Sequence, residues 1–236
     1  MKLLNGNCLE VLKTLPDKSV DLVMCDLPYG VTECDWDIKI DLNLLWEQLL
    51  RIGKKNTPYF FFCKFKFGME IVSANPNMFR YDLVWDKNRL TNPMTSKYGF
   101  ANSHELILVF YDKKPVYNFE TFHKRLPSDR HGIYFSNITG TKAISNNKVV
   151  SYEPKLPLSV IQNNNVMGKN ILRSTQKPVP ILEKIIKYYS NEGDTILDPT
   201  MGSGSTGEAC NNLNRHFIGI EIDKKCFDIA TKRLNI

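Results

Sequence analysis

The chain has 236 residues, 42% hydrophobic and 24% charged, and its formal net charge is +6 at pH 7. This is the composition of an ordinary folded domain, so it excludes disordered and collagen-like chains. No apolar run approaches the roughly 18 residues that a membrane helix needs, and the polar N-terminal stretch is not typical of a signal peptide. We therefore expect a cytoplasmic protein with no membrane partner, whose six scattered cysteines are reduced and mostly buried.

Strands and helices are predicted to alternate in the first and last parts of the chain. In the first part we expect strands at 20–25, 58–63, 81–85 and 105–111, and helices at 42–52 and 69–74. In the last part we expect helices at 180–189, 204–213 and 224–234, and strands at 195–197 and 217–220. This alternation predicts an α/β fold with a mainly parallel sheet.

The positive charge is concentrated in the middle of the chain. Residues 112–175 contain 10 Lys and Arg against 4 Asp and Glu, whereas 1–111 (13 and 13) and 176–236 (8 and 8) are balanced. The segment is also rich in Asn, Ser and Pro and has weak periodicity. It is therefore interpreted as a basic, loop-rich insertion, which is either a solvated surface or a contact surface for a polyanion.

A glycine-rich turn links the predicted strand at 195–197 to the helix that follows. Its sequence is Asp198-Pro199-Thr200-Met201-Gly202-Ser203-Gly204-Ser205-Thr206-Gly207, which matches G-x-G-x-x-G. Glu221 ends the next strand, where a carboxylate can bind a ribose hydroxyl pair, so an adenosine cofactor is indicated. A tight turn without a ligand is the alternative. Asp198 favours S-adenosylmethionine over NAD, because its carboxylate can pair with a cationic methionine group but would repel a pyrophosphate.

A second turn, Asp26-Leu27-Pro28-Tyr29, follows the predicted strand at 20–25. Asp26 can accept a hydrogen bond from an exocyclic amine, a backbone carbonyl of the turn can accept the other hydrogen, and Tyr29 offers a face for stacking a flipped base. A plain turn is the alternative. Methyl transfer to a base amine requires no metal, and no metal-ligand cluster is evident. No cysteine follows a proline, which argues against C5-cytosine chemistry.

The two motifs together resemble those of the β-class DNA amino-methyltransferases. In that family a [DNS]-P-P-[YFW] tetrapeptide is catalytic, and a later D-P-F-x-G-S-G-T-T-like turn binds S-adenosylmethionine. The order also agrees, whereas RNA and protein-amide methyltransferases generally have the cofactor turn first. Further family blocks are similar to Thr175-Gln176-Lys177-Pro178, Phe217-Ile218-Gly219-Ile220-Glu221, Trp85-Asp86-Lys87 and Asn102-Ser103-His104-Glu105.

The resemblance implies a Rossmann-like methyltransferase fold, with a mostly parallel sheet of the seven-stranded type flanked by helices. It divides the chain into a catalytic half (1–111), a target-recognition insertion (112–175) and a cofactor-binding half (176–236). The implied activity is direct in-line methyl transfer to a flipped adenine N6 in double-stranded DNA. Cytosine N4 and a catalytically degenerate nucleic-acid-binding module are the alternatives. A cognate restriction endonuclease and a homodimer are compatible with the resemblance.

The resemblance also assigns residues to these roles. The implied catalytic residues are Asp26, Pro28 and Tyr29. The implied cofactor-binding residues are Asn7, Cys8, Asp26, Gln176, Lys177, Pro178, Asp198, Pro199, Thr200, Gly202, Ser203, Gly204, Ser205, Thr206 and Glu221. The candidate DNA contacts are Lys124, Arg125, Arg130, Lys142, Lys148 and Arg173.

Two positions depart from the family pattern. Leu27 replaces the first proline of the tetrapeptide, and Asn7 stands where an aspartate usually contacts the cofactor's adenine. Asn7 has an alternative role as a helix N-cap, because Glu10 follows three residues later, as in a capping box.

Overall fold

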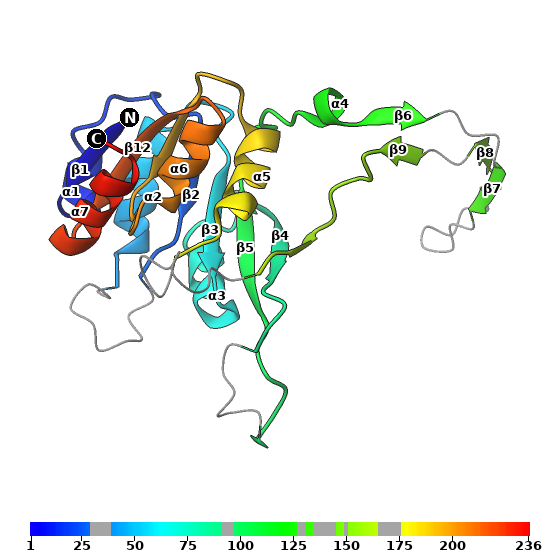
Figure 1. The fold of residues 1–236 in the computed structure, drawn as a ribbon, viewed down its shortest axis with the longest axis horizontal. Helices are drawn as coiled ribbons and strands as arrows, with labels where there is room; N and C mark the ends of the chain where they lie inside the picture. Colours follow the sequence, from blue (N-terminus) through cyan, green and yellow to red (C-terminus); the bar gives the residue numbers. More distant parts are fainter. Residues whose placement is uncertain (29–38, 91–96, 127–130, 135–144, 149–150, 165–175) are drawn as a thin grey trace. The chain divides into compact units, whose positions relative to one another are not determined.

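The computed structural model describes residues 1–28, 39–90, 97–126, 131–134, 145–148, 151–164 and 176–236. The chain forms two compact units (Figure 1). The first unit comprises Met1–Tyr117 and Ser159–Ile236, and the second comprises Asn118–Leu158. The second unit is shorter than the predicted insertion at 112–175, since residues 112–117 and the described residues 159–164 belong to the first unit.

The first unit contains most of the regular structure. Its strands are β1 (Lys2–Asn5), β2 (Leu22–Cys25), β3 (Tyr59–Cys63), β4 (Phe79–Asp86), β5 (His104–Phe110), β10 (Val160–Gln162), β11 (Thr195–Asp198) and β12 (His216–Glu221). Its helices are α1 (Cys8–Leu12), α2 (Leu42–Ile52), α3 (Phe65–Ala74), α5 (Val179–Tyr189), α6 (Ser205–Asn212) and α7 (Lys224–Arg233). Every predicted strand and helix is present, whereas β1 and β10 were not predicted, and α1 was indicated only by the N-cap alternative for Asn7. Segments of three to five residues are too short to establish a hydrophobic period.

The described strands of this unit form an eight-stranded sheet in the order β1-β12-β11-β2-β3-β5-β4-β10. All neighbouring pairs are parallel, except that β5 is antiparallel to both β3 and β4. This confirms the expected Rossmann-like α/β fold. Because β2 and β11 are parallel neighbours, with Leu197 opposite Val23, their carboxyl ends lie at the same edge of the sheet.

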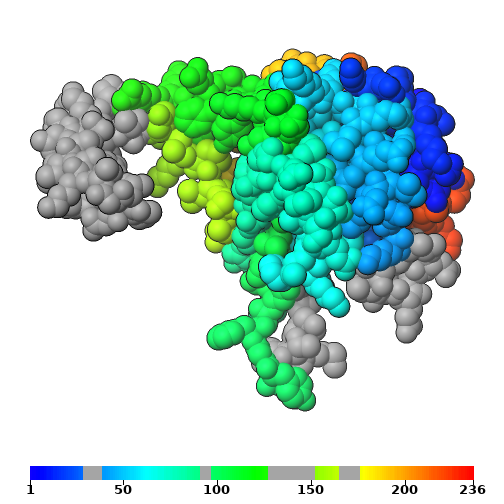
Figure 2. Space-filling view, turned by 180° about the vertical axis from the view of Figure 1, so that it is seen from behind, coloured from blue at the N-terminus to red at the C-terminus, as the bar shows by residue number. Residues whose placement is uncertain are grey.

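Alternate side chains of the central strands enter two hydrophobic cores, one on each face of the sheet. Val23 and Phe61 pack with α1, α2 and α3, whereas Met24 and Phe60 pack with α5, α6 and α7. Figure 1 shows α5 and α6 over one face, and Figure 2, seen from behind, shows N-terminal residues in blue to cyan over the other. Burial on both faces explains why β2 and β3 are continuous apolar runs.

The second unit consists of short elements, which explains the weak periodicity of its sequence. β6 (Lys124–Leu126) is antiparallel to β9 (Ser151–Glu153), and β7 (His131–Tyr134) is antiparallel to β8 (Ser145–Lys148). The short helix α4 (Phe119–Phe122) precedes β6. The ring of Phe119 contacts those of His123 and Tyr152 at centroid distances of 5.1 and 5.3 Å. These aromatic contacts join α4 to β9 within the unit.

Two further expectations concern the whole chain. The described cysteines Cys8, Cys25, Cys63, Cys210 and Cys226 are free thiols and buried, as predicted, and Cys34 lies outside the described residues. No helix in the described ranges has both the length and the apolar character needed to cross a bilayer.

Candidate active site

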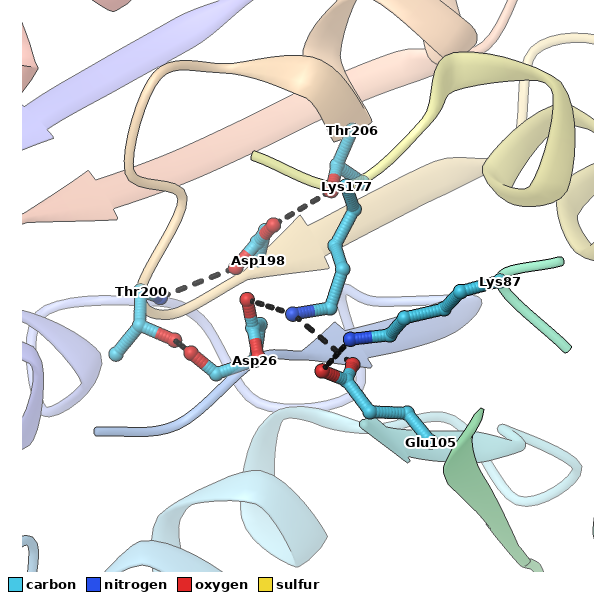
Figure 3. Close-up of polar contacts among 7 residues, drawn as sticks. All are labelled: Asp26, Lys87, Glu105, Lys177, Asp198, Thr200 and Thr206. Atoms are coloured by element: carbon cyan, nitrogen blue, oxygen red, sulfur yellow. Dashed lines mark hydrogen bonds and ion pairs between the residues drawn. The ribbon is translucent and has the colours of Figure 1, made fainter. Parts of the chain in front are cut away.

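The two sequence motifs meet at the carboxyl edge of the sheet. Asp26 follows β2 directly, and Asp198 is the last residue of the neighbouring strand β11. The Thr200 hydroxyl donates a hydrogen bond to the backbone oxygen of Asp26 at 3.0 Å (Figure 3). The glycine-rich turn is therefore attached directly to the tetrapeptide, although 174 residues separate the bonded pair in the sequence.

Two carboxylates fix the shape of the glycine-rich turn. Asp198 accepts hydrogen bonds from the Thr200 backbone N–H at 3.1 Å and the Thr206 hydroxyl at 2.6 Å (Figure 3). Glu221 accepts a hydrogen bond from the Gly202 N–H at 2.8 Å. Gly204 has a φ of +78°, a left-handed conformation that favours glycine and allows the chain to enter α6. The turn is thus held from inside, by side chains of β11 and β12.

Asp198 is in an unusual electrostatic position. Its burial raises the pKa of its carboxyl group to about 7, against the opposing effect of its hydrogen bonds from Thr206 and Thr200. The nearby carboxylates of Asp26 and Glu221 raise this pKa further. The ionised form of Asp198 therefore needs a compensating positive charge, and a cationic ligand beside the turn would supply one.

The serines of the turn point into the protein. Arg233 of α7 lies with its Nη1 atom 3.4 Å from the Ser203 hydroxyl and 3.2 Å from the Ser205 hydroxyl. Its Nε atom also pairs with Glu208 of α6. The two hydroxyls thus help to dock α7 against the start of α6. Arg233 was not among the predicted site residues, because no local sequence pattern links it to the glycine-rich turn.

The N-terminal segment lies at the same edge of the sheet, beside the end of β12. The Gly6 N–H donates a hydrogen bond to the backbone oxygen of Glu221 at 3.0 Å. Asn7 is the N-cap of α1, since its side-chain oxygen accepts a hydrogen bond from the Leu9 N–H at 2.9 Å. Glu10 forms an ion pair with Lys13. Burial raises the pKa of the Cys8 thiol to about 11, so this side chain is neutral at physiological pH.

Three charged side chains that the sequence did not link to Asp26 lie together beside it: Lys177, Glu105 and Lys87. The Lys177 ammonium lies 2.6 Å from Asp26 Oδ2 and 3.6 Å from Glu105 Oε2, and the Lys87 ammonium also pairs with Glu105 (Figure 3). Burial lowers the pKa of Lys177, but Asp26 and Glu105 outweigh it and raise this pKa above its usual value. Burial raises the pKa of Glu105, but Lys177 and Lys87 outweigh it and hold this pKa below its usual value. Lys177 and Glu105 are therefore both charged at neutral pH.

Some of the remaining predicted site residues lie within the described ranges and the others lie outside them. Pro199 and Pro178 are buried, and Pro28 and Gln176 are half-buried. Lys124 and Arg125 are exposed on β6, and Lys148 belongs to β8. Tyr29, Arg130, Lys142 and Arg173 lie outside the described residues.

Comparisons with known proteins agree with this arrangement. The family described as DNA methylase matches residues 20–232. Type II methyltransferase M.HpaI of Haemophilus parainfluenzae is 27% identical over 251 residues, which cover 99% of this chain and 74% of that protein. Type II methyltransferase M.HinfI of Haemophilus influenzae is 29% identical over 266 residues, which cover 98% and 67%.

Solved structures share the fold. The M1.HpyAVI–SAM complex has a TM-score of 0.67 at 24% identity and covers 100% of this chain and 99% of its own. The cytosine-N4-specific PvuII DNA methyltransferase has a TM-score of 0.66 at 13% identity and covers 99% and 92%. Because the family match spans nearly the whole chain, this chain belongs to the S-adenosylmethionine-dependent DNA amino-methyltransferases, which act on adenine N6 or cytosine N4.

Proposed function

We propose that this chain methylates adenine N6 in double-stranded DNA. The observation that carries the proposal is the junction of the two motifs, where Asp26 and the Asp198 turn end neighbouring parallel strands. An in-line transfer requires the methyl donor and the acceptor amine to be held side by side, and this edge of the sheet offers one motif for each. The base must leave the helical stack to reach such a site.

The acceptor side of the site is assigned to the tetrapeptide. The Asp26 carboxylate accepts a hydrogen bond from the base amine and so favours the pyramidal nitrogen that can attack. The nitrogen lone pair would form the new N–C bond as the S–C bond of S-adenosylmethionine breaks with its electron pair left on sulfur, and the nitrogen would then release its extra proton to solvent. Pro28 has no backbone N–H that could compete for the carboxylate, and Tyr29 stacks on the base. Asp at the first position of the tetrapeptide favours adenine over cytosine.

The donor side is assigned to the glycine-rich turn and its neighbours. S-adenosylmethionine supplies an electrophilic methyl group on a sulfonium centre, and Asp198 provides negative charge for its cationic methionine part. Glu221 is oriented by the N–H groups of Gly202 and Asp223, and a carboxylate of fixed direction at this strand end can bind the ribose hydroxyls. Asn7 and Cys8, with Gln176 and Pro178, complete the proposed pocket wall.

The proposed function is tested by incubating duplex DNA of genomic complexity with labelled S-adenosylmethionine, followed by nucleoside digestion and mass spectrometry. We expect N6-methyladenine in the wild-type reaction and none with Asp26→Ala. N4-methylcytosine would refute the choice of base but retain the mechanism. Measurable cofactor binding with no methylated base would favour a degenerate binding module. A homodimer and a cognate endonuclease stay predictions. Analytical ultracentrifugation tests the first of them, because it measures the oligomeric state in solution.

Neutralising Lys124 and Arg125 to glutamine is expected to weaken DNA binding and flatten its salt dependence. Each lost phosphate contact lowers the slope of log K against log salt by about 0.9, so the pair should lower it by about 2. Fluorescence anisotropy between 50 and 200 mM salt, roughly the range over which such effects are large, measures this. The matched control neutralises Lys224 and Lys225, exposed on α7. An equal change in both variants would contradict a specific role for β6.

A further inference from the structure

A row of four alternating charges runs from the interior to the catalytic carboxylate. Its members are Lys87, Glu105, Lys177 and Asp26, and the contacts between them are 2.5, 3.6 and 2.6 Å in that order (Figure 3). The side chains of Lys87, Glu105 and Lys177 are each 11% exposed, whereas that of Asp26 is 28% exposed. The only member with substantial access to solvent among these four is therefore the one that meets the substrate.

The row is costly to bury, so stability alone does not explain it. Buried ions lose hydration, and apolar side chains of similar volume often stabilise a protein equally well or better. Each of the two cations also faces an aromatic ring, since the Lys177 ammonium lies 5.4 Å from the Phe62 ring centroid and the Lys87 ammonium lies 4.7 Å from that of Trp85. Such rings keep the charges in place and weaken their screening by water.

The charged and titratable groups near the Asp26 carboxylate indicate a function for the row of charges. Asp198 lies on its other side and disfavours a second negative charge nearby. The thiols of Cys25 and Cys63 also face this carboxylate, but burial raises both of their pKa values, that of Cys63 to about 12, so both stay neutral. Lys177 supplies the positive charge that offsets Asp198, and Glu105 prevents Lys177 from losing its proton.

We propose that Lys177 is a positioning residue that keeps Asp26 ionised and correctly oriented, and that Glu105 and Lys87 fix Lys177 in turn. This role rests on the proposed function, since it concerns the amine-accepting carboxylate. It also differs from the cofactor contact that the resemblance implies for Lys177, because the ammonium is engaged by two carboxylates behind the acceptor site. Asp26 can accept a hydrogen bond from the base amine only through a carboxylate oxygen of fixed direction.

The test compares Lys177→Met with Lys177→Arg in single-turnover methylation at saturating S-adenosylmethionine, from pH 5 to pH 9. We expect Lys177→Met to lower the rate at least about tenfold and to move the acid limb of the profile upward by about one pH unit. Its affinity for S-adenosylmethionine should be nearly unchanged, and Lys177→Arg should recover most of the rate. A lost affinity with a normal rate at saturation would overturn the proposal and make Lys177 a cofactor ligand.

Glu105→Gln provides a test of opposite sign. Removing this anion makes protonation of Asp26 harder, so the acid limb should move to lower pH, contrary to Lys177→Met. A shift in the same direction in both variants would indicate general damage and overturn the proposal. If Glu105→Gln does not fold, the double variant Lys87→Met/Glu105→Gln takes its place in the comparison with Lys177→Met. It removes both charges of the buried pair and leaves only Lys177 and Asp26 in the row.

A measurement without catalysis separates this proposal from the proposed function. The ¹³C carboxyl signal of Asp26, assigned with Asp26→Asn, can be titrated in the protein without DNA. We expect its midpoint at higher pH in Lys177→Met than in the wild type. This difference would support the role of Lys177 even if the mass spectrum showed a methylated base other than adenine. Identical midpoints would refute it even if N6-methyladenine were found.

Discussion

Asp26→Ala is expected to lower the rate of methyl transfer at least about 10³-fold, while cofactor binding persists. The bond that joins the tetrapeptide to the glycine-rich turn goes from Thr200 to the backbone oxygen of Asp26, so alanine retains it. What is lost is the acceptor for the base amine. Single-turnover methylation measures the rate, and calorimetry with S-adenosylmethionine measures the binding.

Two controls sharpen this experiment. Asp26→Asn preserves the size of the side chain but removes its charge, so an equally strong loss would assign the effect to ionisation. Asp21→Ala removes a carboxylate at the other end of the same strand, where Asp21 pairs with Lys54 and accepts a hydrogen bond from the Thr195 N–H. That variant should lose stability but keep its activity. Turnover by Asp26→Ala within about tenfold of the wild type would refute the catalytic assignment.

Asp198→Asn is expected to stabilise the ligand-free protein at pH 8 while weakening cofactor binding. The pKa of Asp198 rises from 3.8 to about 7 on folding, so between these values the folded state binds more protons than the unfolded state. Stability therefore falls as the pH rises through this interval, by up to about 4 kcal/mol. Asparagine avoids this loss and can still accept a hydrogen bond from the Thr200 N–H. Urea unfolding should show a large gain at pH 8 and a smaller one at pH 5.

The same substitution should alter the pH dependence of cofactor binding. A cationic ligand prefers ionised Asp198, so wild-type affinity should increase as the pH rises through about 7. In Asp198→Asn the affinity should be about 10- to 100-fold weaker at pH 8, and its pH dependence should be flatter. Asp228→Asn, on the exposed face of α7, is the control. Affinity that rises equally with pH in Asp198→Asn would show that another group controls binding.

The main architecture and the meeting of the two motifs could be predicted from the sequence, because each depends on a local pattern. Continuous apolar runs indicate buried strands, and each motif directly follows one of them. Parallel strands then bring the two turns to one edge. The N-cap role of Asn7 was also predictable, since it needs only its neighbours in the chain.

The electrostatic support of the site could not be predicted in this way. Lys177 and Asp26 are 151 residues apart, and Lys87, which directly follows β4, is 18 residues from Glu105 of β5. The sequence showed these residues within family-like blocks, but an ion pair depends on the side chains that three-dimensional packing brings together. The same applies to Arg233, whose contacts with Ser203 and Ser205 turn those hydroxyls toward α7.

The buried thiols make local opening of the catalytic edge measurable by chemical labelling. A protonated, buried thiol reacts slowly with alkylating reagents, and Cys25 and Cys63 lie on the strands that position and flank Asp26. In a Cys34→Ser background, the rate at which Cys25 is alkylated would report how often β2 separates from its neighbours. We expect S-adenosylmethionine to slow this labelling more than that of Cys226 on α7, as mass spectrometry of the alkylated peptides would show. Covalent trapping would then give the opening free energy of the sheet at the point where methyl transfer takes place.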